Sequence, residues 1–431
     1  MDFADFILQH QGDDLPRLAL SRSRYGADVP DWDLALTTLE VRGKLRARVP
    51  EWYALPSLKY PLRLSGEQCS SSETARYKAS VAVAAIRQGL HDEIASASLR
   101  PLPFPPGTGL SLLCGRGWPQ ISACEPCRIA DLTGGLGVDS WAFSQVFGEV
   151  LYNEMRPELA DAARWNFKQL GISNITVSNR ALSPGNVNEI LNGFKADILF
   201  LDPARRASDG RKVFRLEDCE PDVSELLPEL LAAAPLLLLK LSPMADISLL
   251  CKQLGCVKEV HVVAAEGECK ELLLLLERGY EGAVRLVACE SGAAAEIPEE
   301  DPALLSGWGR PEEGAYLFEP GKALLKAGAF TFPCRFGLKK LERHTHLYVA
   351  PGPVPELEPF GKWLPILAWM PFNKQTVKDL SSRIGPAEII ARNFPLSSED
   401  LRKKLKLPEG TSARIYAAKT LEGKSLIICK L

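Results

Sequence analysis

The chain has 431 residues, of which 46% are hydrophobic and 24% charged. This length exceeds one compact core and predicts two to four domains, and the composition excludes disordered and fibrous proteins. The apolar runs are shorter than the roughly 20 residues that span a bilayer, and the acidic first residues lack a basic, apolar leader. We therefore expect a cytoplasmic protein with no membrane partner.

Charge and cysteines add two expectations. The net charge is −3, but from Gly321 onward 19 Lys and Arg stand against 9 Asp and Glu. This basic end predicts an anionic partner, although a solvated lysine-rich surface explains it equally well. The eleven cysteines fit free thiols in a reducing compartment. Cys124 and Cys127, with Cys114 upstream, lack a fourth zinc ligand, so we expect no metal.

The first quarter of the chain has a helical pattern. Apolar residues recur at helical spacing in Asp33–Arg48 and in Ser71–Leu90. The Pro- and Gly-rich stretch Arg100–Gly117 then predicts a linker. We expect a helical N-terminal domain over residues 1–107.

Short β-type runs alternate with amphipathic helices between about Arg128 and Tyr280, which predicts an α/β fold with a parallel sheet. The expected strands are Arg128–Leu132, Glu149–Asn153, Ile175–Val177, Ala196–Leu201, Pro235–Leu241, Val257–Val263 and Glu271–Glu277. The expected helices are Val138–Phe147, Glu158–Leu170, Val187–Leu191, Val223–Ala233 and Ala245–Leu254. The last two strands are close enough to form a hairpin.

The remaining third predicts two smaller regions. The acidic, Gly- and Pro-rich stretch Glu281–Gly314 predicts loops around a small subdomain, which a helix at Gly321–Ala327 closes. From about Leu357 the pattern is α+β. Its expected helices are Val377–Arg383 and Ser398–Lys404, and its expected strands are Glu388–Asn393, Ala413–Lys419 and Ser425–Cys429.

A strand that runs into a glycine-rich turn carries the strongest motif, Asp131-Leu132-Thr133-Gly134-Gly135-Leu136-Gly137. The acid precedes the loop, whereas a dinucleotide fingerprint begins with its glycines. The pattern Asp131-x-Thr133-x-Gly135-x-Gly137 resembles the donor-binding loop of class I methyltransferases, with threonine in the first glycine position. A tight turn without a ligand is the alternative.

Glu154 follows the next expected strand, 23 residues after Asp131. A carboxylate there can accept hydrogen bonds from both ribose hydroxyls, although a surface Glu at a helix start is also common. In methyltransferases the residues after the third strand contact adenine, which here indicates Asn179 or Arg180.

The second motif, Asp202-Pro203-Ala204-Arg205, ends a buried strand, and ligands of open α/β sheets bind at such ends. It resembles the D/N-P-P-x element of methyltransferases that act on nucleobases, but Arg205 replaces an aromatic residue, which leaves the acceptor atom open. The basic loop that follows, with Arg206, Arg211 and Lys212, suits either phosphate contacts or solvent.

Further segments carry a closer resemblance: Glu67–Ser71, Thr74–Ala79, Asp131–Asp139, Asp202–Arg206, Lys240–Met244, Gly267–Glu271 and Phe318–Pro320. With these, the chain resembles bacterial class I methyltransferases that use S-adenosyl-L-methionine and bear a C-terminal THUMP-like domain. The resemblance implies a Rossmann-like core at 108–280, a small ferredoxin-like subdomain at 281–350 and an α+β THUMP-like domain at 357–431. THUMP domains are associated with RNA, which agrees with the basic end.

We accordingly expect methyl transfer to a nucleobase in a structured RNA. The expected catalytic residues are Asp202, Pro203 and Arg205, and the expected cofactor-binding residues are Asp131, Thr133, Gly135, Gly137, Glu154, Asn179, Arg180 and Asp202. Lys240 or Ser242 could assist Asp202. A thiolate for carbon methylation would be Cys269, but a lone cysteine is usually a small buried apolar residue. His344 and His346 lack a third metal ligand.

Other readings remain open at this point. The chain could be a non-catalytic RNA-binding protein with a degenerate core, or a methyltransferase for a small molecule or a protein. A nicotinamide oxidoreductase is disfavoured by the acid before the glycine loop. The sequence leaves the oligomeric state open.

Overall fold

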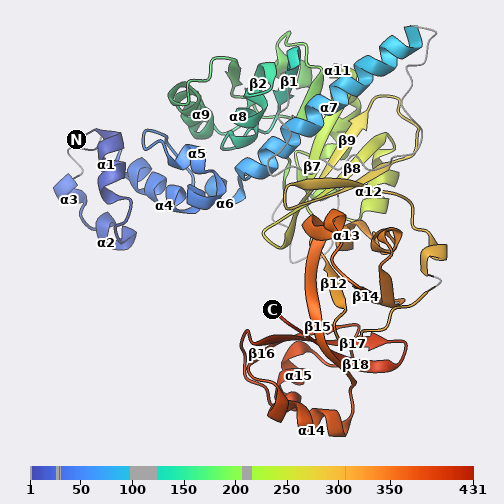
Figure 1. The fold of residues 1–431 in the computed structure, drawn as a ribbon. Coiled ribbons are helices and arrows are strands. Elements are labelled where there is room, and N and C mark those ends of the chain that lie inside the picture. The colour runs from blue at the N-terminus through green and yellow to red at the C-terminus, as the bar shows by residue number, and fades with distance from the viewer. Residues whose placement is uncertain (1, 26–28, 30, 98–123, 206–215, 306) are drawn as a thin grey trace. The chain divides into compact units, whose positions relative to one another are not determined.

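The computed structural model describes residues 2–25, 29, 31–97, 124–205, 216–305 and 307–431 (Figure 1). The chain divides into two compact units. The first contains the described residues up to 284, apart from 261–271, and the second contains 261–271 and 285–431. The linker expected at Arg100–Gly117 lies outside the described residues.

The first unit begins with helices, as expected from the sequence. They are α1 (Phe3–His10), α2 (Leu15–Ala19), α3 (Arg22–Tyr25), α4 (Trp32–Arg48), α5 (Pro50–Tyr53), α6 (Arg63–Gln68) and α7 (Ser72–Ala97). Asp2, Asp14 and Asp31 cap α1, α2 and α4, because each side chain accepts a hydrogen bond from a backbone N–H three residues on. Phe6 and Trp32 lie in the core between these helices.

A mostly parallel sheet forms the rest of the first unit. Its strands are β1 (Cys124–Asp131), β2 (Phe147–Asn153), β3 (Ile175–Ser178), β4 (Ile198–Leu201), β7 (Leu236–Leu241), β8 (Val257–Ala265) and β9 (Glu268–Glu277). Its helices are α8 (Val138–Ser144), α9 (Pro157–Gln169), α10 (Val187–Leu191), α11 (Val223–Ala233) and α12 (Ile247–Leu254). The order is β8-β9-β7-β4-β1-β2-β3, although residues 261–265 of β8 and 268–271 of β9 are assigned to the second unit. The pairs from β7 to β3 are parallel, whereas β9 runs antiparallel to β7. The expected α/β sheet is confirmed.

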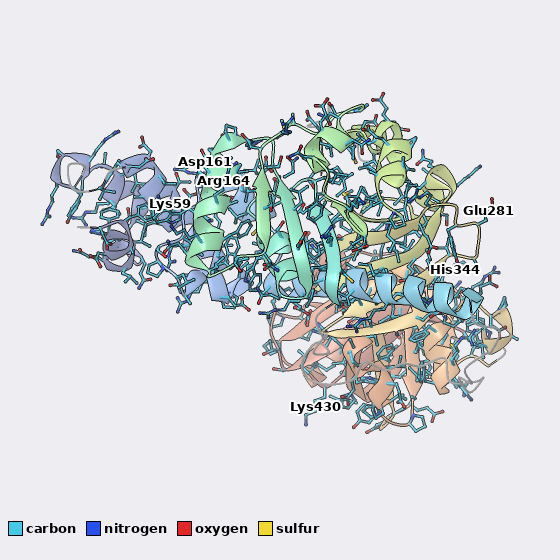
Figure 2. All side chains as sticks on the ribbon, turned by 90° about the horizontal axis from the view of Figure 1, so that it is seen from above. Lys59, Asp161, Arg164, Glu281, His344 and Lys430 are labelled. Carbon is cyan, nitrogen blue, oxygen red and sulfur yellow. The ribbon has the colours of Figure 1, made fainter. Side chains whose placement is uncertain are left out.

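Polar contacts join the helical part to the sheet part within this unit. The Asn166 side chain, fully buried on α9, accepts a hydrogen bond from the Lys59 N–H at 2.8 Å and donates one to the Lys59 carbonyl at 2.9 Å. Figure 2 shows Lys59 next to the helix that carries Asp161 and Arg164. Helix α7 packs against α8. The N-terminal helices are therefore docked on the sheet part of the unit.

The second unit contains a seven-stranded sheet in the order β13-β14-β12-β15-β18-β17-β16. These strands are β12 (Tyr316–Pro320), β13 (Lys339–Glu342), β14 (Thr345–Ala350), β15 (Gly361–Pro371), β16 (Ala387–Arg392), β17 (Ala413–Thr420) and β18 (Gly423–Cys429). Its helices are α13 (Lys322–Ala327), α14 (Lys374–Arg383) and α15 (Ser398–Leu405), and short 3₁₀ turns lie at Pro302–Leu305, Phe332–Phe336 and Pro355–Phe360. The α+β expectation for the C-terminal region is confirmed.

The expectation of loops over Glu281–Gly314 is wrong in part. Strands β10 (Arg285–Glu290) and β11 (Ala293–Ile297) form an antiparallel hairpin there. Ser291 and Gly292 both have positive φ, at 52° and 76°, which is the backbone that a tight hairpin turn needs. Separately, none of the helices in the described residues combines the length and apolar character that crossing a bilayer requires.

Candidate functional site

Three acidic side chains come together at the carboxyl ends of the central strands. In the sheet register, Asp131 at the end of β1 lies beside Tyr152 of β2 and Phe200 of β4. Glu154 and Asp202 each follow those neighbours by two residues. The two sequence motifs therefore meet at one edge of the sheet, where ligands of open α/β folds bind.

The glycine-rich loop is pressed against an aromatic ring on one side and open on the other. A Cβ at Gly134 would overlap the ring of Tyr152, and one at Gly137, whose φ is +93°, would lie 2.8 Å from Phe167. A Cβ at Gly135, with φ +52°, would approach only the Thr133 carbonyl, at 3.9 Å. Glycine is thus needed for the fit of the loop, and the face at Gly135 is left open.

Asp131 is fully buried beneath this loop. Its carboxyl group accepts a hydrogen bond from the Ser140 hydroxyl at 2.5 Å and one from the Thr133 N–H at 3.2 Å. Burial raises the pKa of Asp131 to about 8, against the opposing effect of the Ser140 hydrogen bond. Burial thus favours the neutral form of this carboxyl group, which supports the loop from below.

Glu154 lies against the open part of the loop. Its carboxylate accepts hydrogen bonds from the N–H groups of Gly135 and Arg156, both at 2.9 Å. The Tyr152 hydroxyl donates to the Gly135 carbonyl at 2.7 Å. The structure thus brings Glu154 to Gly135.

The segment after β3 is fixed beside Glu154 by amide side chains. Asn179 donates to the Glu154 carbonyl at 2.6 Å, and Asn153 donates to the carbonyls of Leu132 and Arg180. The Arg180 side chain instead approaches Glu189 at 3.8 Å, where both are exposed. Asn153, which is buried, was not among the residues singled out from the sequence, and only its place at a strand end could have indicated it.

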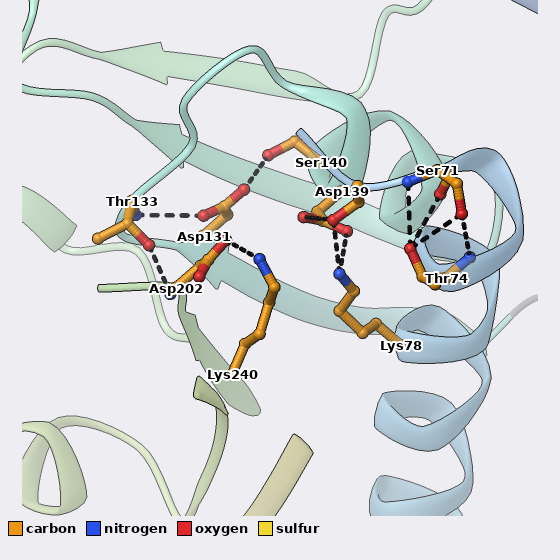
Figure 3. Close-up of polar contacts among 10 residues, drawn as sticks. Ser71, Thr74, Lys78, Asp131, Thr133, Asp139, Ser140, Asp202 and Lys240 are labelled. Carbon is orange, nitrogen blue, oxygen red and sulfur yellow. Dashed lines mark hydrogen bonds and ion pairs between the residues drawn. The ribbon is translucent and has the colours of Figure 1, made fainter. Parts of the chain in front are cut away.

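Asp202 is held by Thr133 of the glycine-rich loop and by Lys240 (Figure 3). Its backbone N–H donates to the Thr133 hydroxyl at 2.7 Å, so the threonine in the first glycine position links the loop to β4. Its carboxylate accepts a hydrogen bond from Lys240 of β7 at 2.5 Å, and 31% of the side chain stays exposed. A half-exposed carboxylate at a strand end can accept a hydrogen bond or a proton from a ligand.

The residues after Asp202 are described only in part. Pro203 is half-buried, and the backbone of Arg205 forms the short strand β5 (Ala204–Arg205) with β6 (Cys219–Glu220). The Arg205 side chain lies outside the described part of the chain, as do Arg206, Arg211 and Lys212. Their expected phosphate contacts stay a prediction.

Sequence reasoning missed the first turn of α8. Ser140 bonds Asp131, and Asp139 forms an ion pair with Lys78 at 2.9 Å and accepts a hydrogen bond from Ser70 at 2.8 Å. Lys78 and Ser70 belong to the N-terminal helical part. Both lie in segments that carried the family resemblance, but their partner is distant in sequence.

The side candidates have simpler explanations. Burial raises the pKa of Cys269 to about 11, so its thiol is not poised as a thiolate. His346 stacks on Phe330 at 3.9 Å, and burial lowers its pKa to about 4. Among the described residues, no three His, Cys, Asp or Glu side chains gather as metal ligands. Cys127 is disulfide-bonded, so the expectation of free thiols is wrong at that residue.

Comparison with known proteins finds matches to the two C-terminal regions and to most of the chain. A family model described as a ferredoxin-like domain matches residues 316–357, and one described as THUMP domain-like matches residues 361–431. A Mycobacterium tuberculosis protein named as an uncharacterized S-adenosylmethionine-dependent methyltransferase is 23% identical over 282 residues, 65% of this chain and 74% of its own. The crystal structure of a protein from Porphyromonas gingivalis W83 assigned as a methyltransferase is 27% identical, with a TM-score of 0.74 over 99% of this chain and 97% of its own.

Proposed function

The chain is an S-adenosylmethionine-dependent methyltransferase with a C-terminal THUMP-like domain, and we propose that its acceptor is a nucleobase in a structured RNA. The observation that supports RNA as the acceptor is the match of residues 361–431 to a THUMP-like domain. The 2.7 Å hydrogen bond between the Thr133 hydroxyl and the Asp202 N–H supports the place of the transfer site. It joins the donor loop to the residue that would meet the acceptor.

The residues at the loop fit a donor with a ribose and a charged amino-acid tail. Glu154 would accept the ribose hydroxyls, and the open face at Gly135 would receive the tail. Asn179 and the backbone of Arg180 would border the adenine, and the buried Asp131 and Gly137 would keep the loop in shape. S-adenosyl-L-methionine supplies an electrophilic methyl group bound to a sulfonium.

The acceptor side is built around the Asp202 carboxylate. The ion pair with Lys240 fixes the carboxylate at the end of β4, while part of the side chain remains exposed. Asp202 would orient the acceptor through a hydrogen bond and take up its proton, which is the main chemical task left to the protein in methyl transfer. Pro203 and Arg205 follow directly and would complete this side.

A basic surface with an aromatic pair supports RNA as the partner of the second unit. Lys404 lies 5.5 Å from the ring of Phe372, which packs edge-on against Phe394 at 5.1 Å. Lys424 is next to Phe372, because its carbonyl accepts the Phe372 N–H. Lys374 stands in the first turn of α14, where the helix dipole disfavours a cation.

These three exposed lysines, Lys374, Lys404 and Lys424, have no ion-pair partner within the described part of the chain. Unpaired cations beside aromatic rings suit phosphates and unstacked bases. We call Lys374, Lys404, Lys424, Phe372 and Phe394 the C-terminal basic surface.

Mass spectrometry of nucleosides tests the proposal. RNA would be isolated from cells that lack the protein and from the same cells supplied with the wild type or with Asp202→Asn. We expect one methylated nucleoside to disappear without the protein and to return only with the wild type. If the three RNA preparations have the same modified nucleosides, RNA is not the acceptor.

A further inference from the structure

Lys78, Ser70 and Asp139 form a closed, buried triangle of polar contacts. Figure 3 shows the Lys78 and Asp139 side chains of this triangle. The Lys78 ammonium is 2.9 Å from Asp139 and donates to the Ser70 hydroxyl at 2.6 Å, and that hydroxyl donates to Asp139 at 2.8 Å. Lys78 is fully buried, and Ser70 and Asp139 are nearly so. Lys78 and Ser70 come from the N-terminal helical part, whereas Asp139 belongs to the methyltransferase core.

Stability alone is a poor reason for such a triangle. The desolvation of two buried charges often equals or exceeds their attraction, so well-packed apolar residues can replace a buried ion pair without loss. Lys78 also lies 5.9 Å from the ring of Phe200 on β4. The triangle therefore calls for an explanation other than its contribution to the free energy of unfolding.

Its position provides that explanation. Asp139 is the second residue of α8, which begins directly after the loop glycine Gly137. A continuous set of hydrogen bonds leads from there to the reacting edge. Ser140 donates to Asp131 at 2.5 Å, Asp131 accepts the Thr133 N–H, and Thr133 accepts the Asp202 N–H. A shift of the first turn of α8 would thus move the loop and Asp202 together.

We infer that Lys78 and Ser70 are positioning residues for methyl transfer: through Asp139 they fix the start of α8 and hence the shape of the donor loop. The N-terminal helical part is then a component of the donor site and not only a separate module. This inference rests on the donor-binding part of the proposed function and is independent of the nature of the acceptor.

The test measures donor affinity and stability side by side. Calorimetry with S-adenosyl-L-methionine and thermal melting would be applied to full-length wild type, Lys78→Met, Ser70→Ala and the double variant K78M/D139N. Lys78→Met leaves a buried carboxylate unpaired and should lower the melting temperature. We expect it to raise the donor Kd about tenfold, as small misplacements of a binding group do. Ser70→Ala should raise the Kd less.

The double variant separates positioning from stability. Replacing Asp139 with asparagine removes the unpaired charge, so K78M/D139N should regain much of the melting temperature but keep the weak donor binding. Asn166→Ala is the matched control, since it removes an equally buried contact of the N-terminal part to α9. It should lower the melting temperature and leave the donor Kd within about twofold.

Three results would overturn the inference. One is wild-type donor affinity in Lys78→Met, or in Ser70→Ala where Lys78→Met does not fold. Another is a double variant whose affinity recovers together with its stability. A wild-type protein that does not bind the donor would reject the proposed donor site itself, and with it the role of Lys78.

Discussion

Polar residues are arranged in opposite ways in two regions of the molecule. One is the proposed donor edge of the first unit, at Asp131, Glu154 and Asp202, and the other is the C-terminal basic surface of the second unit. At the donor edge, Asp131 and Glu154 are buried, and each accepts hydrogen bonds from the glycine-rich loop or the helix that follows it. On the C-terminal basic surface, the lysines are exposed and form no ion pair with the described residues. The first region depends on the geometry of single atoms, whereas the second depends on a sum of charges. Substitutions should therefore act steeply in one region and gradually in the other.

The steepest effect is expected at Asp202. Asp202→Asn keeps the backbone hydrogen bond to Thr133 but loses the negatively charged carboxylate that would take up the proton. We therefore expect kcat to fall about 100-fold or more, while the affinity for S-adenosyl-L-methionine changes little. Single-turnover transfer with the methylated RNA fragment would measure this. Asp197→Asn is the matched control at the other end of β4, where the carboxylate accepts the Arg128 N–H at 2.7 Å. Equal losses in both variants would contradict the role of Asp202.

A smaller effect is expected at Thr133. Thr133→Val keeps the shape of the side chain but leaves the Asp202 N–H without its acceptor, which costs about 1–3 kcal/mol. We expect kcat/KM to fall about tenfold, and we expect Thr133→Ser, which retains the hydroxyl, to stay near the wild type. A serine variant as impaired as the valine variant would show that this bond is not the cause.

The C-terminal basic surface should respond in steps. Filter binding across a salt series would give the slope of log K against log salt. Each of Lys374→Ala, Lys404→Ala and Lys424→Ala should reduce this slope by about 0.7–0.9, and the triple variant by about 2–3. Lys403→Ala and Lys419→Ala are controls, because those lysines already pair with Glu399 and Glu342 at 3.0 Å. Steps of equal size in the controls would argue against a specific surface.

A separate effect, on stability and not on activity, is a pH dependence at Asp131. Its raised pKa means that the folded protein binds more protons than the unfolded chain between about pH 4 and pH 8, so unfolding free energy falls as pH rises through this window. Asparagine does not titrate. The melting temperature of Asp131→Asn relative to wild type should therefore rise from pH 5 to pH 8. A difference that is constant across this range would contradict the raised pKa.

The strand ends of the donor edge could be predicted from the sequence because each one has a local signal. Asp131 and Asp202 follow short apolar runs and precede a glycine or proline. The apolar run indicates the strand and the glycine or proline indicates its end, so both residues can be located without tertiary information. The geometry that joins them could not be predicted. Ser70 and Asp139 are 69 residues apart, and nothing local marks a hydroxyl that will meet a distant carboxylate.

Two strands of the second unit could not be predicted because their sequences lack a local signal. β11 is the alanine-rich segment Ala293–Ile297, and β15 contains Pro365, so neither has a strong local preference for a strand. Pairing with β10 and with β12 and β18 decides their conformation. The local sequence therefore predicts loops over β11 and no strand over β15, whereas tertiary hydrogen bonds make strands of both.

The seven-stranded sheet has a consequence for how this protein can be divided. Strand β12 lies in the ferredoxin-like match and β15 in the THUMP-like match, yet they pair along their length from Tyr316 and Pro365 to Pro320 and Gly361. Glu319 adds two bonds across the same boundary, to Arg392 at 2.6 Å and to Tyr416 at 2.7 Å. The two regions thus share one backbone ladder and would be inherited, exchanged or lost together. A cut at residue 360 that separates the two regions would leave the edges of β12 and β15 unpaired, and unpaired strand edges are prone to aggregate.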